Sequence, residues 1–234
     1  MLRELLSIFR SEKPLAQMGD DFAQMLRLTL EMTLQAGNIY FGKSVAPDER
    51  TQIYKRDVQV NKLERDIRRQ VIAHLSLAGT SASLPYCLLL MSLVKDVERL
   101  GDYAKNLSEA GELHPDPLPD DEIVGELKEV RAGVEAAFGV TAEVFASSDR
   151  ERALTLIREG RDLTHRCDAL ISWVARSDYS AAMATTAVLG ARFYKRIAAH
   201  VLNVLSSVVM PLHKLDYYDE DEIGRQRREE AEEV

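Results

Sequence analysis

The sequence predicts an all-α fold built as two tandem three-helix bundles. Glycine and proline are scarce, with 12 Gly and 7 Pro in 234 residues, and long stretches contain neither. Apolar residues recur at the three- and four-residue spacing of a helix face, and no segment shows the two-residue alternation of a strand. Hydrophobic residues make up 46% of the chain, which is enough to form a packed core.

The first half of the chain is predicted to hold a short amphipathic helix followed by three long helices. The short helix should cover residues 1–10, and Pro14 should separate it from a long helix over 19–41. The second long helix is expected over 48–79 and the third over 84–109. The third carries a stripe of apolar and small residues that should face the core: Leu90, Val94, Val97, Gly101, Ala104 and Ser108.

A proline-rich segment at 113–121 divides the chain. Its three alternating prolines cannot lie inside a helix. After it the helical pattern restarts as three further helices. Ser148 and Glu151 predict a capping box at the start of the second of these, and Ser177 with Asp178 should cap the third.

The two halves resemble each other, which indicates an internal duplication. Shifting the third helix by 97 residues places Arg99 on Arg196 and Asn106 on Asn203, and a shift of 103 aligns the second helices. The predicted organisation is an N-terminal amphipathic segment at 1–17, a first three-helix repeat at 18–112, a proline-rich linker at 113–121, a second three-helix repeat at 122–212 and a charged tail at 213–234.

The charge of the chain is concentrated in its tail. The formal net charge is -8, and the stretch 216–234 alone contains nine acidic residues against three arginines. The remainder is nearly neutral, which argues against nucleic acid as a partner. No apolar run is long enough to cross a bilayer, and the N-terminus lacks the cleavage site of a signal peptide. We therefore expect a cytoplasmic protein.

Two helices of the first repeat carry polar oxygen atoms beside their apolar faces. Asp57, Asn61 and Glu64 lie at i, i+4 and i+7 on the second helix, and Glu98 and Asp102 lie four apart on the third. Like charges at this spacing repel each other on a bare helix. If the two polar edges face one another, their carboxylate and amide oxygens would suit a cation, which would remove the repulsion.

A simpler interpretation accounts for the pair Glu98 and Asp102 without a metal. Lys95, Arg99 and Lys105 lie within one turn of the two acids and can neutralise them on a solvated face. Acid pairs within a helix are common, so this spacing taken alone favours the simpler interpretation.

The second and third helices also resemble a known family. Residues 97–106, Val-Glu-Arg-Leu-Gly-Asp-Tyr-Ala-Lys-Asn, resemble the E-R-(I/L)-G-D signature and following asparagine of the PhoU family of phosphate-signalling regulators. Residues 56–64 resemble its companion segment, and the resemblance extends over about 18–212. It implies a divalent or trivalent metal ion, such as iron, zinc or magnesium, held by Asp57, Asn61, Glu64, Glu98 and Asp102.

The resemblance further implies a non-enzymatic cytoplasmic regulator of phosphate uptake and phosphate-starvation signalling. The implied partners are a phosphate transporter component, either an ATPase subunit or a sodium–phosphate symporter, and a phosphate-sensing histidine kinase. Through such a transporter the protein would be recruited to the inner face of the membrane. We also expect a homodimer that does not bind nucleic acid.

The second repeat departs from the family pattern, so the metal is expected in the first repeat only. The positions that match Asp57, Asn61, Glu98 and Asp102 hold no carboxylate; they are Gly160, Thr164, Lys195 and Ala199. Two alternative functions remain open: a carboxylate-bridged metalloenzyme and a metal-free oligomeric interaction scaffold. The chain lacks the Glu-x-x-His turn of helical di-iron enzymes and the glycine-rich loop of nucleotide hydrolases, which weighs against the enzyme.

Overall fold

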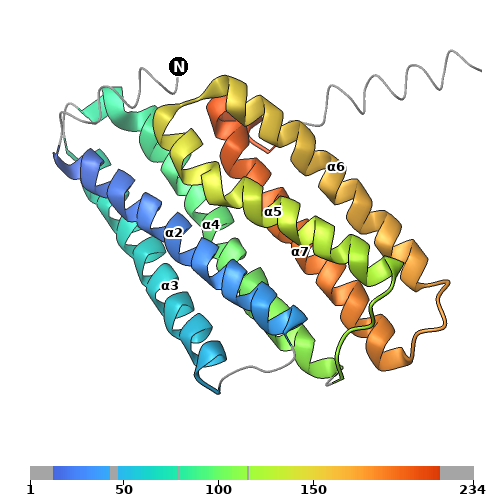
Figure 1. Ribbon diagram of the computed structural model, residues 1–234. Helices are drawn as coiled ribbons and strands as arrows, with labels where there is room; N and C mark the ends of the chain where they lie inside the picture. Colours follow the sequence, from blue (N-terminus) through green and yellow to red (C-terminus); the bar gives the residue numbers. More distant parts are fainter. Residues whose placement is uncertain (1–12, 43–46, 78–79, 115, 217–234) are drawn as a thin grey trace, which may run out of the picture.

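The computed structural model describes residues 13–42, 47–77, 80–114 and 116–216, which form long α-helices and no β-strand (Figure 1). The all-α prediction is confirmed. The short helix predicted at 1–10 and the tail beyond 216 lie outside the described residues. The long helices are α2 (Lys13–Phe41), α3 (Pro47–Leu75), α4 (Leu84–Ala110), α5 (Glu122–Ser147), α6 (Arg150–Val174) and α7 (Ala181–Val209).

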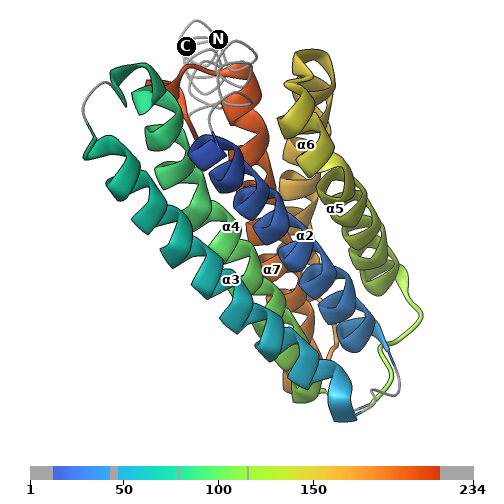
Figure 2. The same ribbon diagram turned by 90° about the vertical axis from the view of Figure 1, so that its left-hand side faces the viewer.

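These helices pack as two groups of three. Helices α2, α3 and α4 pack on one another, and so do α5, α6 and α7. The groups are joined mainly by α4 lying along α7, with a smaller contact between α2 and α5. Figure 1 shows α3 and α6 at the two outer edges, and Figure 2 shows α3 lying along the outside of the first group. No helix in the described part of the chain is long and apolar enough to span a membrane.

The apolar core is continuous between the two groups. One cluster of buried side chains draws on all six helices. The stripe predicted on the third helix faces this core, because each of its members, from Leu90 to Ser108, is buried. Since the core does not divide at the proline-rich linker, the residue limits proposed for the two repeats stay a prediction.

Two helix boundaries in the first group differ from the prediction. Helix α2 begins at Lys13, well before Gly19, and Pro14 lies in its first turn. A backbone N–H is not needed at that position for a helical hydrogen bond, so proline is tolerated there. Helix α3 ends at Leu75 rather than at Gly79.

The caps predicted in the second group were also misplaced. Ser148 does not open α6; it ends α5 in the left-handed conformation with φ of 52°. Asp149 caps α6 instead, where its side chain accepts a hydrogen bond from the Arg152 N–H. Helix α7 is capped by Ser180, which lies beyond the predicted Ser177 and Asp178. In both cases several capping residues stand in a row, and spacing alone does not select among them.

Helix α2 approaches α7 closely at a glycine. The Tyr40 hydroxyl donates a hydrogen bond of 2.8 Å to the Thr186 carbonyl oxygen. A Cβ atom placed on Gly190 would lie 2.3 Å from the Tyr40 hydroxyl oxygen, far inside contact distance. The junction between the two groups therefore requires a residue without a side chain at this position.

Substituting Gly190→Ala should lower the free energy of unfolding by about 1–3 kcal/mol, because the added methyl group displaces a buried tyrosine. Chemical denaturation would measure the change. Gly139→Ala is the matched control, since a Cβ there meets nothing within 4 Å and should stabilise its helix by about 0.5–1 kcal/mol. A Gly190→Ala protein as stable as the wild type would contradict this account of the junction.

Candidate functional site

The polar edges of α3 and α4 predicted from the sequence do meet, and a lysine joins them. Lys105 on α4 places its Nζ atom 3.3 Å from Asp57 Oδ2 on α3 and 3.3 Å from Asp102 Oδ1 on its own helix. Burial lowers the pKa of Lys105, but the two carboxylates raise it by more, so its pKa lies above the usual value. The ammonium group is therefore held in its charged form between the two acids.

The other acids on α4 carry basic partners as well. Glu98 Oε2 lies 2.6 Å from Lys95 Nζ, and Arg99 Nη1 lies 3.1 Å from Asp102 Oδ2. These are the contacts that the metal-free interpretation of the Glu98 and Asp102 pair requires. The face is less solvated than that interpretation assumed, since the Glu98 side chain is only 12% exposed.

The remaining two predicted ligands, both on α3, are also engaged. Glu64 is buried, and its Oε1 atom lies 2.9 Å from Nη2 of Arg68 on the next turn of the helix. Asn61 donates an amide N–H to Asp57 Oδ2 over 3.4 Å. Asn61 thus presents a hydrogen-bond donor toward Asp57, whereas a cation requires the amide oxygen.

The side chains as placed do not fit a metal ion. Within the ranges that the structure describes, no three histidine, cysteine, aspartate or glutamate side chains are arranged to hold one. The Lys105 ammonium lies where a cation between Asp57 and Asp102 would have to bind. Uptake of iron, zinc or magnesium by this chain stays a prediction from the family resemblance.

The second group also carries an ion pair between its second and third helices, α6 and α7. Lys195 on α7 places its Nζ atom 2.5 Å from Asp168 Oδ2 on α6. Gly160, which replaces the aspartate of the first repeat, has a packing role: a Cβ there would lie 2.5 Å from a methyl carbon of Leu202. At this one position, the loss of a carboxylate in the second repeat therefore allows α6 to pack directly against Leu202 of α7.

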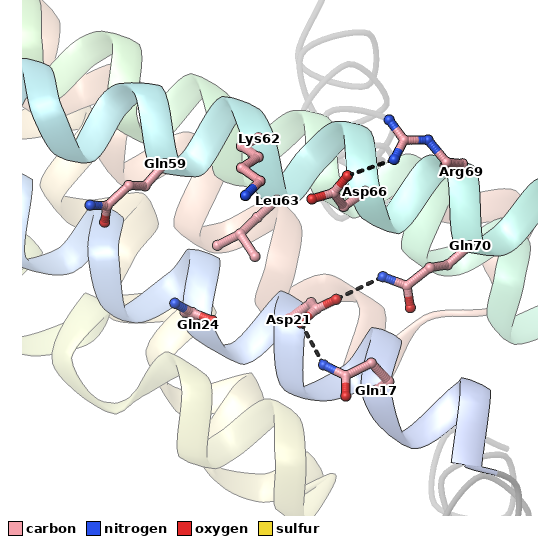
Figure 3. A pocket seen from close by; sticks show the side chains of 9 residues that line it. All are labelled: Gln17, Asp21, Gln24, Gln59, Lys62, Leu63, Asp66, Arg69 and Gln70. Atoms are coloured by element: carbon pink, nitrogen blue, oxygen red, sulfur yellow. Dashed lines mark hydrogen bonds and ion pairs between the residues drawn. The ribbon is translucent and has the colours of Figure 1, made fainter.

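A polar groove lies between α2 and α3, on a different side of α3 from the predicted ligands (Figure 3). Its volume is about 470 Å³. Asp21 on α2 accepts hydrogen bonds of 2.8 Å from the side-chain amides of Gln17, one turn earlier on the same helix, and of Gln70 across the groove on α3. None of the five predicted ligands lines it; the lining residues are Gln17, Asp21, Gln24, Gln59, Lys62, Leu63, Asp66, Arg69 and Gln70.

A buried polar cluster between α4 and α7 was not anticipated from the sequence. Asp96 Oδ1 accepts a hydrogen bond of 2.7 Å from the Asn203 side-chain amide and lies 2.8 Å from His200 Nδ1. The Tyr103 ring stacks on the His200 ring. The available sequence evidence was an acid directly beside Val97, a member of the buried stripe, together with polar residues inside the apolar pattern of the last helix. The cluster fixes the alignment of α4 against α7.

Comparison with known proteins identifies the domain. Residues 2–111 match the model of the PhoU domain family, described as "PhoU domain". A comparison with curated protein sequences finds no match. Two solved structures share the fold at 17% sequence identity. PhoU from Pseudomonas aeruginosa has a TM-score of 0.75, with 84% of this chain and 95% of that chain covered.

The second structure is the phosphate transport system regulatory protein PhoU from Streptococcus pneumoniae. Its TM-score is 0.73, with 83% of this chain and 92% of that chain covered. Both alignments extend well beyond the segment that the family model matches. The resemblance inferred from the motifs is confirmed: residues 2–111 match the PhoU domain family, and over most of its length the chain has the fold of the two PhoU structures.

Proposed function

We propose that this protein regulates phosphate uptake and phosphate-starvation signalling as a helical adaptor that binds a phosphate transporter component. The observation that carries the proposal is the PhoU domain at residues 2–111, set in a fold shared with PhoU proteins along most of the chain. Binding to a phosphate-sensing histidine kinase, assembly as a homodimer and recruitment to the inner face of the membrane are expected from the same resemblance.

The chemistry of the α3–α4 edge supports an adaptor rather than an enzyme. A carboxylate-type metalloenzyme needs an open coordination position and a group that transfers protons. Here the acids of the edge already hold basic partners, and Lys105 stands between Asp57 and Asp102. We therefore assign these side chains a role in joining helices.

The outer face of α3 offers a surface for such a partner. Its exposed residues form a continuous line at spacings of three and four, about 27 Å long at 1.5 Å per residue. We call this line the basic stripe; it comprises Tyr54, Val58, Lys62, Arg65, Arg69 and Ile72. Apolar side chains flank its three positive charges, with Val58 65% exposed on one side of them and Ile72 63% exposed on the other.

The basic stripe has unsatisfied charge and is confined to one repeat. Among the described residues Lys62 and Arg65 form no ion pair, while Arg69 pairs only with its neighbour Asp66. On α6, a shift of 103 residues puts Asp168 and Ser172 at the places of Arg65 and Arg69. Exposed apolar groups beside unpaired positive charge suit an acidic protein surface, so we assign the stripe to an acidic face of the transporter component.

The wild-type protein should co-purify with a phosphate transporter component from cells grown with abundant phosphate. Because the family acts on phosphate uptake, mass spectrometry should identify an ATPase subunit or a symporter in the complex. Washing with increasing salt should release it, since the proposed contact is partly electrostatic. Recovery of neither transporter nor kinase at any phosphate level would contradict the proposed function.

Reversing charge on the basic stripe should weaken this complex. We expect the double substitution Arg65→Glu with Arg69→Glu to reduce the recovered transporter component at least tenfold, because attraction across the interface becomes repulsion. Arg158→Glu is the control, as it reverses an exposed charge on α6 outside the stripe. Equal recovery with both proteins would exclude the stripe as the contact surface. Loss of binding only to vesicles of anionic lipid would assign the stripe to a membrane surface instead.

A further inference from the structure

We propose that the Lys105 ammonium group is the resident cation of the first bundle, and that it joins α3 to α4 in the place where the PhoU resemblance implies a metal ion. This inference concerns the chain's own side chains. It does not depend on the adaptor function, since it would hold whatever the protein binds.

The first argument is position. The Lys105 Nζ atom is 3.3 Å from one carboxylate oxygen on each of the two helices. A metal ion bound to Asp57 and Asp102 would take oxygen atoms at about 2.0–2.6 Å from them. It would then lie in the space that the ammonium occupies, and the two positive charges would repel each other strongly at that range.

The second argument is burial. The side chains of Asp57, Lys105 and Asp102 are only 13%, 22% and 26% exposed, so little water is available to screen the acids if the lysine leaves. Removing one partner from a mostly buried ion pair leaves an uncompensated charge. This lowers the free energy of unfolding by more than the intact pair raises it relative to neutral residues at the same positions. A metal ion that displaced Lys105 would thus have to bind strongly enough to offset the loss of both lysine–carboxylate contacts.

The third argument is charge balance around the site. Glu64 and Glu98, which a metal would need as further ligands, carry their own partners in Arg68 and Lys95. Together with Lys105 and Arg99, four basic side chains face four carboxylates. The cluster is neutral without any added ion, whereas a cation site needs an excess of negative charge.

The second bundle uses the same device with different residues. Lys195 on α7 pairs with Asp168 on α6, so again a lysine of the third helix of the repeat reaches an aspartate of the second. Lys195 stands at the position that matches Glu98, and Lys105 has no lysine at its own matched position, Leu202. Each bundle therefore holds its second and third helices together by a lysine–aspartate contact of its own.

The test begins with the wild-type protein, purified without a histidine tag. We expect substoichiometric metal by inductively coupled plasma mass spectrometry. The melting temperature should not change when EDTA is added or when iron(II), zinc or magnesium is supplied in excess. Stoichiometric metal whose removal by EDTA lowers the melting temperature would overturn the proposal, and this measurement requires no variant.

A substitution of Lys105 then tests whether this lysine prevents a metal ion from binding between Asp57 and Asp102. Lys105→Met keeps the apolar stem but leaves Asp57 and Asp102 unpaired, which should lower the melting temperature by roughly 2–8 °C. Added zinc or iron(II) should restore part of this loss in the variant and none in the wild type. Lys105→Arg keeps the positive charge, so added metal should not change the melting temperature of this variant. It replaces the methionine variant in the test if that variant does not fold.

Two control variants separate a specific effect from general destabilisation. Adding Asp57→Asn to Lys105→Met should abolish the recovery by metal, because one carboxylate is then missing. Lys195→Met breaks the corresponding pair in the second bundle and should not recover with metal, since the matched positions there lack acids. If Lys105→Met bound metal no better than the wild type, the lysine would not be standing in for a cation.

Discussion

The packing of α4 along α7 is the constraint on which the rest of the structure depends. These two helices lie between the outer helices α3 and α6, and each contacts the two other helices of its own group as well as its counterpart. Both must therefore be apolar on several sides, and each buries a large number of small and aliphatic side chains. Burying aliphatic side chains is the main favourable contribution to folding, so α4 and α7 each contribute more to stability than either outer helix. The outer helices, covered on one side only, are free to carry charge.

The electrostatic arrangement follows from this division. The side of α3 that meets α4 holds acids whose charge is balanced by lysine and arginine of the same two helices. The opposite side faces solvent, and there Lys62 and Arg65 form no ion pair with any residue that the structure describes. The charges at the contact between α3 and α4 are thus neutralised within the folded protein. Those on the outer face of α3 remain available for a partner.

Much of the fold could be predicted from the sequence because helix periodicity is a local property. The stripe on α4 was identified residue by residue, since each member recurs at helical spacing and each is buried. Helix ends were less predictable: Ser177, Asp178 and Ser180 are three possible capping residues close together, and the cap of α7 is the last of them.

The site was predicted only in part because its chemistry depends on which side chains meet. Sequence spacing correctly placed acids at facing edges of α3 and α4, and it named Lys105 as a neutralising residue of its own helix. It could not show that this lysine also reaches Asp57, 48 residues away in the chain. The Asp96, His200 and Asn203 cluster joins residues more than 100 positions apart, so the polar residues within each helix pattern did not show that they meet.

The α4–α7 contact also bears on how such a chain can arise. If the duplication predicted from the sequence is correct, α4 and α7 are the matched third helices of the two repeats, and the contact between them joins equivalent surfaces, as in a two-fold symmetric dimer. A polypeptide consisting of one repeat would expose that surface and would have to cover it with a second copy of itself. Fusion of the two copies makes the pairing permanent and independent of concentration. It also frees each copy to diverge, so that Arg65 and Arg69 of the basic stripe on α3 have Asp168 and Ser172 at the matching positions of α6.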